Sequence, residues 1–187
     1  MNRMVQDNEP NENSTDLELI ARWSAGDERA ATRLVERHAP ALARFAASLG
    51  QRIDIEEIVQ DTFVRAFGSI DSFRADSSLR TWLFTIERRL ILDRRRAERR
   101  RKEDGTIDDA DAATEFDALD EIVAEEAEAR VRSAVERLSR LQREVFLLRV
   151  NEGLSYKEIA EVVGSTEGAA RVHYHNAMRA VKESLYV

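Results

Sequence analysis

The chain has 187 residues, with 36 acidic side chains against 29 lysines and arginines, and it contains no cysteine. This length suits one domain or two small ones, and the lack of cysteine excludes disulfide frameworks, thiolate metal sites and a cysteine nucleophile. Two prolines and seven glycines are few for a sheet-rich fold, so the composition favours an all-α protein. No apolar run approaches the ~20 residues of a membrane span, and the polar N-terminus lacks the layout of a signal peptide, so we expect a cytoplasmic protein without membrane insertion.

The chain begins with a polar segment and two predicted helices. Residues 1–14 carry almost no large apolar side chain, and we expect them to be disordered. A helix is predicted to begin near Thr15 or Asp16, where a capping residue precedes a run of apolar positions. Apolar side chains at helical spacing predict a second helix over residues 28–49, which Pro40 either bends or splits.

Two further helices are predicted on either side of a polar loop at residues 71–78. The third follows Gly50, with its apolar residues on one face and Glu57, Gln60 and Asp61 away from that face. The fourth covers residues 79–101, apolar at its start and strongly basic at its end. By itself, a charged face like that of the third helix is usually just solvated.

Charge is segregated along the middle of the chain. Residues 88–102 hold eight arginines and one lysine against two acids, a net of +7, whereas residues 103–128 hold twelve acids and no base. Without that acidic stretch the rest of the chain carries 29 − 24 = +5. Its first part cannot bury enough apolar surface to offset the entropy of ordering. We therefore expect two small helical domains, at residues 15–102 and 121–187, joined by a flexible acidic linker at residues 103–120.

The C-terminal domain is predicted to hold one long helix and then two short ones. The long helix runs from about residue 116 or 121 to residue 150. Ser155 and Glu158 form a capping box, Gly164 suits a left-handed stop, and Thr166 caps the last helix. Helix, glycine turn and helix make a helix-turn-helix, whose second helix enters the major groove of DNA. A helical hairpin with a solvated outer face is the alternative.

The basic run predicts a nucleic-acid strand as ligand, and nothing in the sequence predicts catalysis. Trp82 and Phe84 precede the run, and cations beside aromatic rings suit phosphates and bases, although Trp82 is first expected in the core. His38 is expected to be a satisfied core residue, while His173 and His175 diverge on a helix and cannot share a metal. We expect no enzyme activity, no cofactor and no metal.

Three segments together resemble the conserved regions of bacterial sigma factors of the extracytoplasmic-function type, the smallest class, which keeps only regions 2 and 4. IEEIVQDTFVRAF resembles region 2.2, SSLRTWLFTIERRLILDRRR resembles regions 2.3 and 2.4, and LQREVFLLRVNEGLSYKEIAEVVGSTEGAAR resembles region 4. They occur in the family's order with an unstructured linker between them, which is more specific than any one motif. The resemblance implies an alternative sigma factor that binds core RNA polymerase and directs transcription initiation.

The resemblance also implies three sets of site residues. Region 2.2 should dock on the largest polymerase subunit, and the candidate contacts are Glu57, Gln60 and Asp61. Regions 2.3 and 2.4 should melt the promoter −10 element and hold a flipped base and phosphates, with the candidates Asp76, Ser77, Ser78, Arg80, Arg88, Arg89, Arg94, Arg95 and Arg96. The last helix should read the −35 element, with the candidates Thr166, Arg171, Val172, His175 and Asn176.

The resemblance further implies promoter DNA and a cognate anti-sigma factor as partners, with the linker threading into polymerase channels. The last helix departs from the family pattern at Val172, His173 and Asn176, where small polar or basic residues are more usual. Two other readings stay open. One is a stand-alone helix-turn-helix regulator that binds DNA without polymerase, and the other is a decoy that sequesters an anti-sigma factor. Whether DNA binding requires core polymerase discriminates among them.

Overall fold

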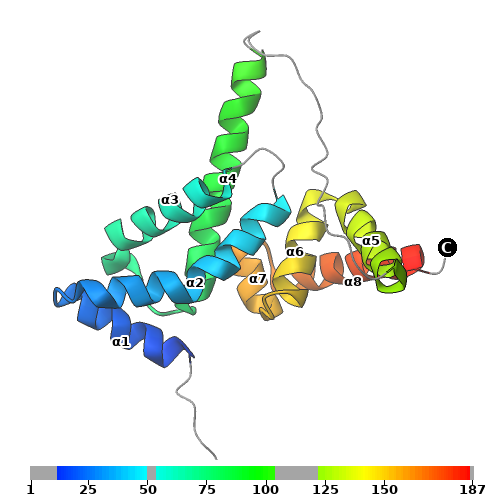
Figure 1. The fold of residues 1–187 in the computed structure, drawn as a ribbon. Helices are drawn as coiled ribbons and strands as arrows, with labels where there is room; N and C mark the ends of the chain where they lie inside the picture. The colour runs from blue at the N-terminus through cyan, green and yellow to red at the C-terminus, as the bar shows by residue number, and fades with distance from the viewer. Residues whose placement is uncertain (1–11, 50–53, 104–121, 186–187) are drawn as a thin grey trace, which may run out of the picture.

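The computed structural model describes residues 12–49, 54–103 and 122–185, and these residues form helices joined by turns (Figure 1). The helices are α1 (Glu12–Ser24), α2 (Glu28–Leu49), α3 (Ile55–Gly68), α4 (Leu79–Glu103), α5 (Ile122–Arg137), α6 (Arg140–Val150), α7 (Tyr156–Val163) and α8 (Glu167–Leu185), with a short 3₁₀ turn, η1 (Ile70–Ser72), after α3. The all-α prediction is confirmed for this part of the chain. The predicted linker and most of the predicted disordered N-terminus lie outside the described residues.

Helices α1 to α4 form an N-terminal module around the buried face of α2. α1 is tied to α2 by the carboxylate of Asp16, which accepts hydrogen bonds from the side chains of Arg37 at 2.6 Å and His38 at 2.9 Å. Asp16 and His38 are both 2% exposed. The expectation that His38 is a satisfied core residue is therefore confirmed, because its ring is buried and its Nε2 pairs with Asp16 of the neighbouring helix.

Two predicted helix boundaries differ from those in the structure. α1 begins at Glu12, so residues 12–14 are helical although they were expected to be disordered. α4 continues to Glu103, one residue into the predicted linker. Helix ends depend on one or two marginal hydrogen bonds, which composition alone does not locate. Pro40 lies inside α2 without splitting it, because buried apolar residues on both sides hold the helix against its neighbours.

The prediction of one long helix up to residue 150 was wrong, because Ser139 divides it into α5 and α6. The Ser139 Oγ accepts from the Gln142 backbone N–H at 3.4 Å, and the Gln142 side chain accepts from the Ser139 N–H at 3.2 Å. This capping box starts a new helix. Arg143 donates to the Val135 carbonyl at 3.0 Å and so completes the end of α5.

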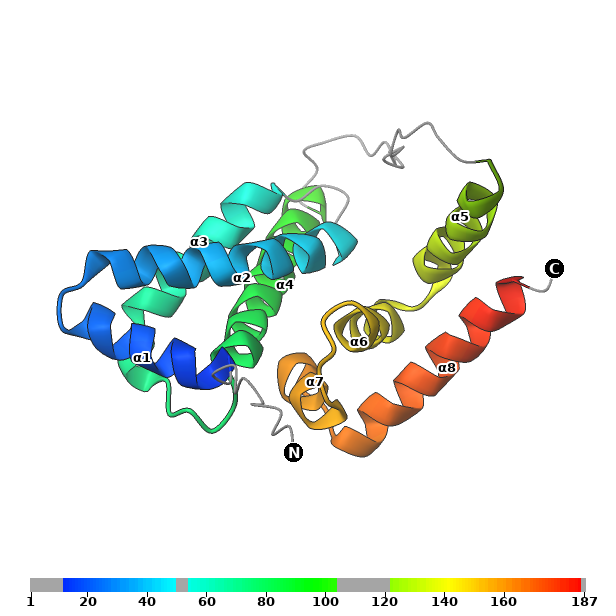
Figure 2. The same ribbon diagram turned by 60° about the horizontal axis from the view of Figure 1, so that its bottom comes forward.

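The helix-turn-helix at α7 and α8 has the predicted local chemistry. Ser155 and Glu158 form a reciprocal capping box, and Gly164 ends α7 with a φ of 68°. The Thr166 Oγ1 accepts from the Ala169 N–H at 3.2 Å and so caps α8. α8 also packs along α5 and α6, which fixes its direction relative to the turn (Figure 2).

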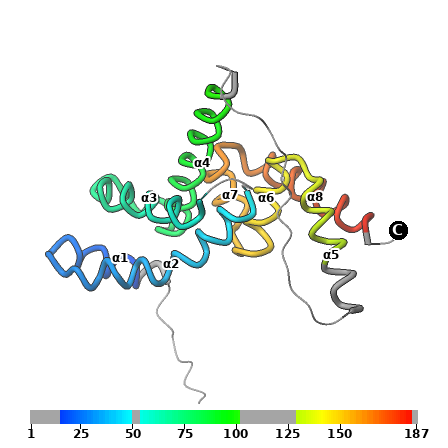
Figure 3. Tube along the Cα trace, turned by 45° about the horizontal axis from the view of Figure 1, so that its top comes forward, coloured from blue at the N-terminus to red at the C-terminus, as the bar shows by residue number. Residues whose placement is uncertain are grey.

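The two modules pack against each other. α7 contacts α4 and α6 contacts α2, so the turn between α6 and α7 faces the N-terminal module (Figure 3). One cluster of buried apolar side chains extends from α1–α4 into α6 and α7, while a second lies among α5, α6 and α8. We call this packing of α6, α7 and their turn on α2 and α4 the closed arrangement.

Candidate functional site

The basic helix α4 presents two arginines toward the C-terminal module. Arg80, Phe84 and Arg88 are spaced four residues apart and therefore share one face of the helix. Phe84 is fully buried and packs edge-on against Phe45 of α2, with ring centroids 5.3 Å apart. The Arg80 guanidinium lies 5.8 Å from the centre of the Phe84 ring. The buried Phe84 ring thus anchors this face of α4 against α2, and the positions of Arg80 and Arg88 follow from it.

Arg80 donates to a buried carboxylate of the other module. Its partner is Glu152, in the turn between α6 and α7, whose side chain is 2% exposed. Arg44 of α2 donates to both oxygens of the same carboxylate, at 3.1 Å each. Glu152 therefore joins α2 and α4 of one module to the turn that precedes the helix-turn-helix of the other.

Arg88 makes the second ion pair between the modules. Its Nε donates to Glu144 of α6 at 2.7 Å, and the two side chains are 13% and 1% exposed. The second oxygen of Glu144 forms an ion pair with Arg140, one turn earlier on the same helix, at 3.1 Å. Two further hydrogen bonds join the modules, since the Ser77 hydroxyl donates to Glu161 at 2.7 Å and the Thr81 hydroxyl donates to Glu158 at 3.2 Å. We call these contacts, together with the ion pairs of Arg44, Arg80 and Arg88, the seam between the modules.

The remaining −10 candidates have three kinds of surroundings. Asp76, Arg89 and Arg96 are exposed. The Ser78 Oγ accepts from the Thr81 N–H at 3.1 Å, so in this structure Ser78 caps α4. Arg95 is half-buried, and burial together with the nearby Arg140 lowers its guanidinium pKa. The exposed −10 candidates are therefore Asp76 in the loop before α4, and Arg89 and Arg96 in the middle and later part of α4.

The candidates for polymerase contact lie on the outer face of α3, and two of the three pair with Arg94, the ninth −10 candidate. The Arg94 guanidinium donates to Glu57 at 2.8 Å and to Asp61 at 2.6 Å. The hydrogen bond to Glu57 is the main reason why the pKa of Arg94 is raised. Glu57 and Asp61 remain 56% and 44% exposed. Arg94 thus fixes two accessible carboxylates one helical turn apart, with Gln60 between them in the sequence.

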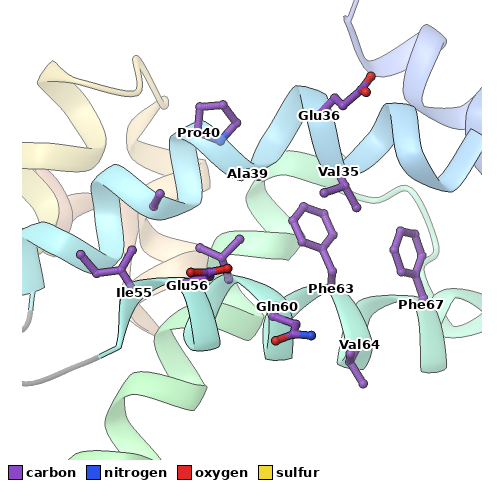
Figure 4. Close-up of a pocket in the computed structure, with 12 residues that line it drawn as sticks. Val35, Glu36, Ala39, Pro40, Ile55, Glu56, Gln60, Phe63, Val64 and Phe67 are labelled. Carbon is purple, nitrogen blue, oxygen red and sulfur yellow. The ribbon is translucent and has the colours of Figure 1, made fainter.

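An apolar groove runs beside these carboxylates, between α2 and α3 (Figure 4). The apolar side chains that line it include Val35 and Pro40 of α2 and Val59, Phe63 and Phe67 of α3. Gln60 lines the groove, so the polar row and the groove are continuous. A groove of this kind accepts the apolar side of a helix, and a carboxylate row beside it favours a partner with basic side chains.

The candidates for −35 recognition lie on α8. Arg171, Val172 and His175 are exposed on its outer face, whereas Asn176 is half-buried and Thr166 caps the helix. The Arg171 guanidinium pairs with Glu167 at 2.9 Å and lies 4.8 Å from the centre of the Tyr156 ring. Arg149 lies 4.9 Å from the same ring. Tyr156 therefore orients a side chain that the sequence assigned to base contact.

Glu87 is a fully buried carboxyl group of α4, and neither of its oxygens has a hydrogen-bond partner. Burial raises its pKa well above the ordinary value, and the nearby negative charge of Glu152 raises it further. An acid whose pKa is raised in the folded protein stabilises the fold below its unfolded-state pKa. That contribution is lost as the pH rises through the folded-state value.

Folding stability is therefore expected to fall as the pH rises above about 4.5, the ordinary pKa of Glu87. Replacing Glu87 with glutamine should flatten this dependence, because the substituted residue takes up no proton. Because a single proton is involved, the equilibrium constant for folding changes by at most about tenfold for each pH unit. Urea midpoints between about pH 4 and 9 measure it, with the exposed-site variant Glu18→Gln as control. Parallel profiles for Glu87→Gln and the unsubstituted protein would contradict the prediction.

Sequence reasoning missed the acids that contact the arginines. Glu144 and Glu152 were not singled out, and neither were their neighbours Glu87 and Thr81. The spacing of apolar residues in the sequence could have identified two of these residues, Glu87 and Glu144. Glu87 lies four residues after Leu83 and four before Ile91, and Glu144 lies four before Leu148, so helical spacing puts both carboxyl groups on buried stripes.

Among the described residues, no three histidines or carboxylates are grouped as a metal site would require. None of the described helices combines the length and the hydropathy that crossing a bilayer demands.

Two family models match the chain, one on each module. Sigma-70 region 2 matches residues 34–101, and Sigma-70, region 4 matches residues 128–181. The first range covers nearly all of α4, and the second covers α7 and most of α8.

Similar proteins span nearly the whole chain. An ECF RNA polymerase sigma-E factor of Haemophilus influenzae is 31% identical over 183 residues, covering 93% of this chain and 97% of that protein. The RNA polymerase sigma factor NccH of Alcaligenes xylosoxydans xylosoxydans is 34% identical over 161 residues, covering 83% and 87% of the two chains.

Two solved structures are similar to the fold. The sigma factor RpoE of Bartonella quintana, in complex with the anti-sigma factor NepR, superposes with a TM-score of 0.66 at 30% identity, covering 83% of this chain and 96% of that one. CnrH in complex with the cytosolic domain of CnrY gives a TM-score of 0.65 at 31% identity, covering 91% and 97%.

Proposed function

The chain belongs to the extracytoplasmic-function family of RNA polymerase sigma factors, and from this membership we propose how its surfaces divide the work of initiation. The protein is an alternative sigma factor that directs promoter recognition, and it is not an enzyme. We assign residues 15–102 to the region 2 domain, 103–120 to a linker and 121–187 to the region 4 domain. The observation that carries the proposal is the pairing of a basic, aromatic-lined helix with a helix-turn-helix in one chain.

Region 2 is proposed to melt and hold the −10 element. Asp76, Ser77, Ser78 and Arg80 belong to the loop and first turn of α4, where an extruded base needs a pocket. The positive charge further along the helix, at Arg88, Arg89, Arg95 and Arg96, neutralises the phosphates of the displaced strand. Support comes from the exposure of Asp76, Arg89 and Arg96.

Core polymerase is proposed to bind at the outer face of α3. Glu57, Gln60 and Asp61 offer polar contacts, and the groove beside them accepts apolar side chains of a polymerase helix. We reassign Arg94 from phosphate binding to the positioning of this face, because both of its hydrogen bonds go to Glu57 and Asp61.

Region 4 is proposed to read the −35 element through Arg171, Val172, His175 and Asn176, with Thr166 at the helix start. The early residues of a recognition helix meet base edges in the major groove. We also propose a cognate anti-sigma factor as a partner, because RpoE and CnrH were solved with NepR and CnrY, and we propose a cytoplasmic location.

Run-off transcription tests the proposal directly. The purified chain is added to bacterial core polymerase with sheared genomic DNA, and new 5′ ends are mapped. Starts that share two upstream elements and need the protein support the proposal. Tight core binding without starts would favour the decoy, and DNA binding by the protein alone without core binding would favour the stand-alone regulator.

Arg171→Ala is expected to weaken promoter binding by about 1–3 kcal/mol at one −35 position, because a bidentate contact with guanine is lost. The measurement is holoenzyme binding to a set of promoters with single −35 substitutions. A uniform loss across the set would instead assign Arg171 to a phosphate. Lys182→Ala, on the same helix and also exposed, is the comparison variant.

A further inference from the structure

We propose that a phosphate group binds between the two modules, held by Arg95 of α4 and Arg140 of α6. The phosphate belongs either to a small phosphorylated ligand or to a nucleic-acid backbone, since the recognition chemistry is the same for both. This site goes beyond the proposed function, because Arg140 has no assigned part in promoter recognition and binding needs neither promoter element.

The ion pairs of the seam follow a regular order along the chain. Arg80 of α4 pairs with Glu152, and Arg88 of α4 pairs with Glu144. The step along α4 is eight residues forward, and the step between the two partners is eight residues backward. α4 and the segment of α6 that faces it therefore run in opposite directions across the seam.

The next level of the seam has a cation on both sides. Arg95 lies seven residues, or about two helical turns, after Arg88, so it continues the face of α4 that meets α6. On α6, Arg140 lies one turn before Glu144. Burial lowers the pKa of Arg95, and the positive charge of Arg140 lowers it further. Two guanidinium groups thus come together where the two earlier levels pair an arginine with a carboxylate.

This level also has more positive charge than negative charge. Arg143 is bound to carbonyl groups at the end of α5 and adds a third cation beside the first two. Arg140 contacts Glu144 through its Nε atom, at 3.1 Å. In the part of the chain that the structure describes, no acceptor pairs with Arg95, and Glu144 is the one partner of Arg140. With four arginines and two acids, the net charge is 4 − 2 = +2, counting Arg88, Arg95, Arg140, Arg143, Glu98 and Glu144.

A phosphate group fits this level in geometry, charge and access. A guanidinium group donates two parallel hydrogen bonds to two oxygens of a phosphate, and two such groups can share one phosphate. A phosphate monoester carries about −1.5 to −2 charges at pH 7, which matches the surplus. The Arg140 side chain is 46% exposed and Arg95 is half-buried. A ligand therefore reaches both side chains from solvent without displacing Glu144.

Inorganic pyrophosphate is the probe for the first test. It is titrated calorimetrically into the full chain at constant ionic strength in a chloride buffer. Arg95→Gln and Arg140→Gln are each expected to raise the dissociation constant about tenfold or more, because each removes charge-assisted hydrogen bonds. The double variant is expected to add less than about threefold to the larger single effect, because either substitution already disrupts a shared site.

The control for these variants is Arg33→Gln, which removes one exposed positive charge from α2. It should bind pyrophosphate within about twofold of the unsubstituted chain, since a distant charge is screened by salt. Lack of saturable binding to the unsubstituted chain, or an equal loss for Arg33→Gln, would overturn the proposal. Effects that simply multiply in the double variant would also overturn it, because they indicate two independent charges.

A second measurement uses the unsubstituted chain and so does not depend on how a variant folds. Phenylglyoxal modifies accessible arginines, and mass spectrometry of peptides locates each modified residue. Pyrophosphate should slow the modification of Arg95 and Arg140 and leave that of Arg33 unchanged. Equal rates at Arg95 and Arg140 with and without pyrophosphate would overturn the proposal.

Competition with a fluorescein-labelled single-stranded DNA of random sequence separates the two sources of phosphate. Displacement of this DNA by pyrophosphate, together with weaker DNA binding by Arg140→Gln, assigns the site to a nucleic-acid backbone. Unchanged DNA binding at saturating pyrophosphate assigns it to a small phosphorylated ligand, and either result supports a phosphate site. Run-off starts without any pyrophosphate binding would overturn this site and still support the proposed function, so the two failures are distinguishable.

Discussion

Replacing Glu57 and Asp61 with lysine is expected to weaken binding to core RNA polymerase by about 2–4 kcal/mol, which is roughly 30- to 1000-fold in the dissociation constant. Both carboxylates are accessible, and both are held in place by Arg94. Reversal places like charges against the basic partner surface that we propose for this face, and it also removes both hydrogen-bond partners of Arg94. Titration of labelled core polymerase with the full chain measures the change.

A charge-matched control separates this effect from net charge. Glu18→Lys with Asp71→Lys makes the same change in total charge at exposed positions on α1 and η1. The control should bind core polymerase within about twofold of the unsubstituted chain, since exposed charges far from an interface contribute little. Equal losses for both variants would mean that α3 does not provide the docking face. A circular-dichroism melt of each variant verifies folding.

Phe84→Ala is expected to lower the free energy of unfolding by about 3–5 kcal/mol. The ring is fully buried between α4 and α2, where it packs against Phe45. Its removal deletes apolar contacts and leaves a cavity that the rigid helix pair cannot close. Arg80 also loses the ring over which its guanidinium lies. Urea denaturation measures the difference in free energy.

The comparison for Phe84 is Val150→Ala at the end of α6. Val150 is 52% exposed, so this truncation should cost less than about 0.5 kcal/mol. A loss below about 1 kcal/mol for Phe84→Ala would contradict the packing described for α4. A large loss without any change in promoter binding at low temperature would show that Phe84 stabilises the fold and does not position Arg80.

Local chemistry made much of the fold predictable. Ser155 with Glu158, Gly164 and Thr166 are signals that act over three or four residues. α7 begins and ends, and α8 begins, where these signals predicted. The break at Ser139 was carried by the same kind of signal. Apolar residues at helical spacing continue across Ser139, and this pattern predicted one uninterrupted helix. In the structure the capping box of Ser139 and Gln142 ends that continuity and starts α6.

The contacts of the candidate sites were less predictable, because they join residues far apart in the sequence. Arg44 and Glu152 are 108 residues apart, and Arg88 and Glu144 are 56 apart. Sequence spacing places each charge on a helix face but does not say which opposite charge it meets. Arg94 illustrates this, since its position in the basic run predicted a phosphate and its partners are Glu57 and Asp61.

The outer face of α8 remains open in the same arrangement that covers Arg88. Arg171 and Val172 are 54% and 58% exposed, while Glu144, the partner of Arg88, is almost fully enclosed. The surfaces proposed for the two promoter elements are therefore not equally exposed in the closed arrangement. The surface proposed for double-stranded −35 DNA is accessible, whereas Arg80 and Arg88, which are proposed to hold the −10 strand, pair with acids of the other module. With these proposed assignments, we expect contact with the upstream element to precede capture of the downstream strand.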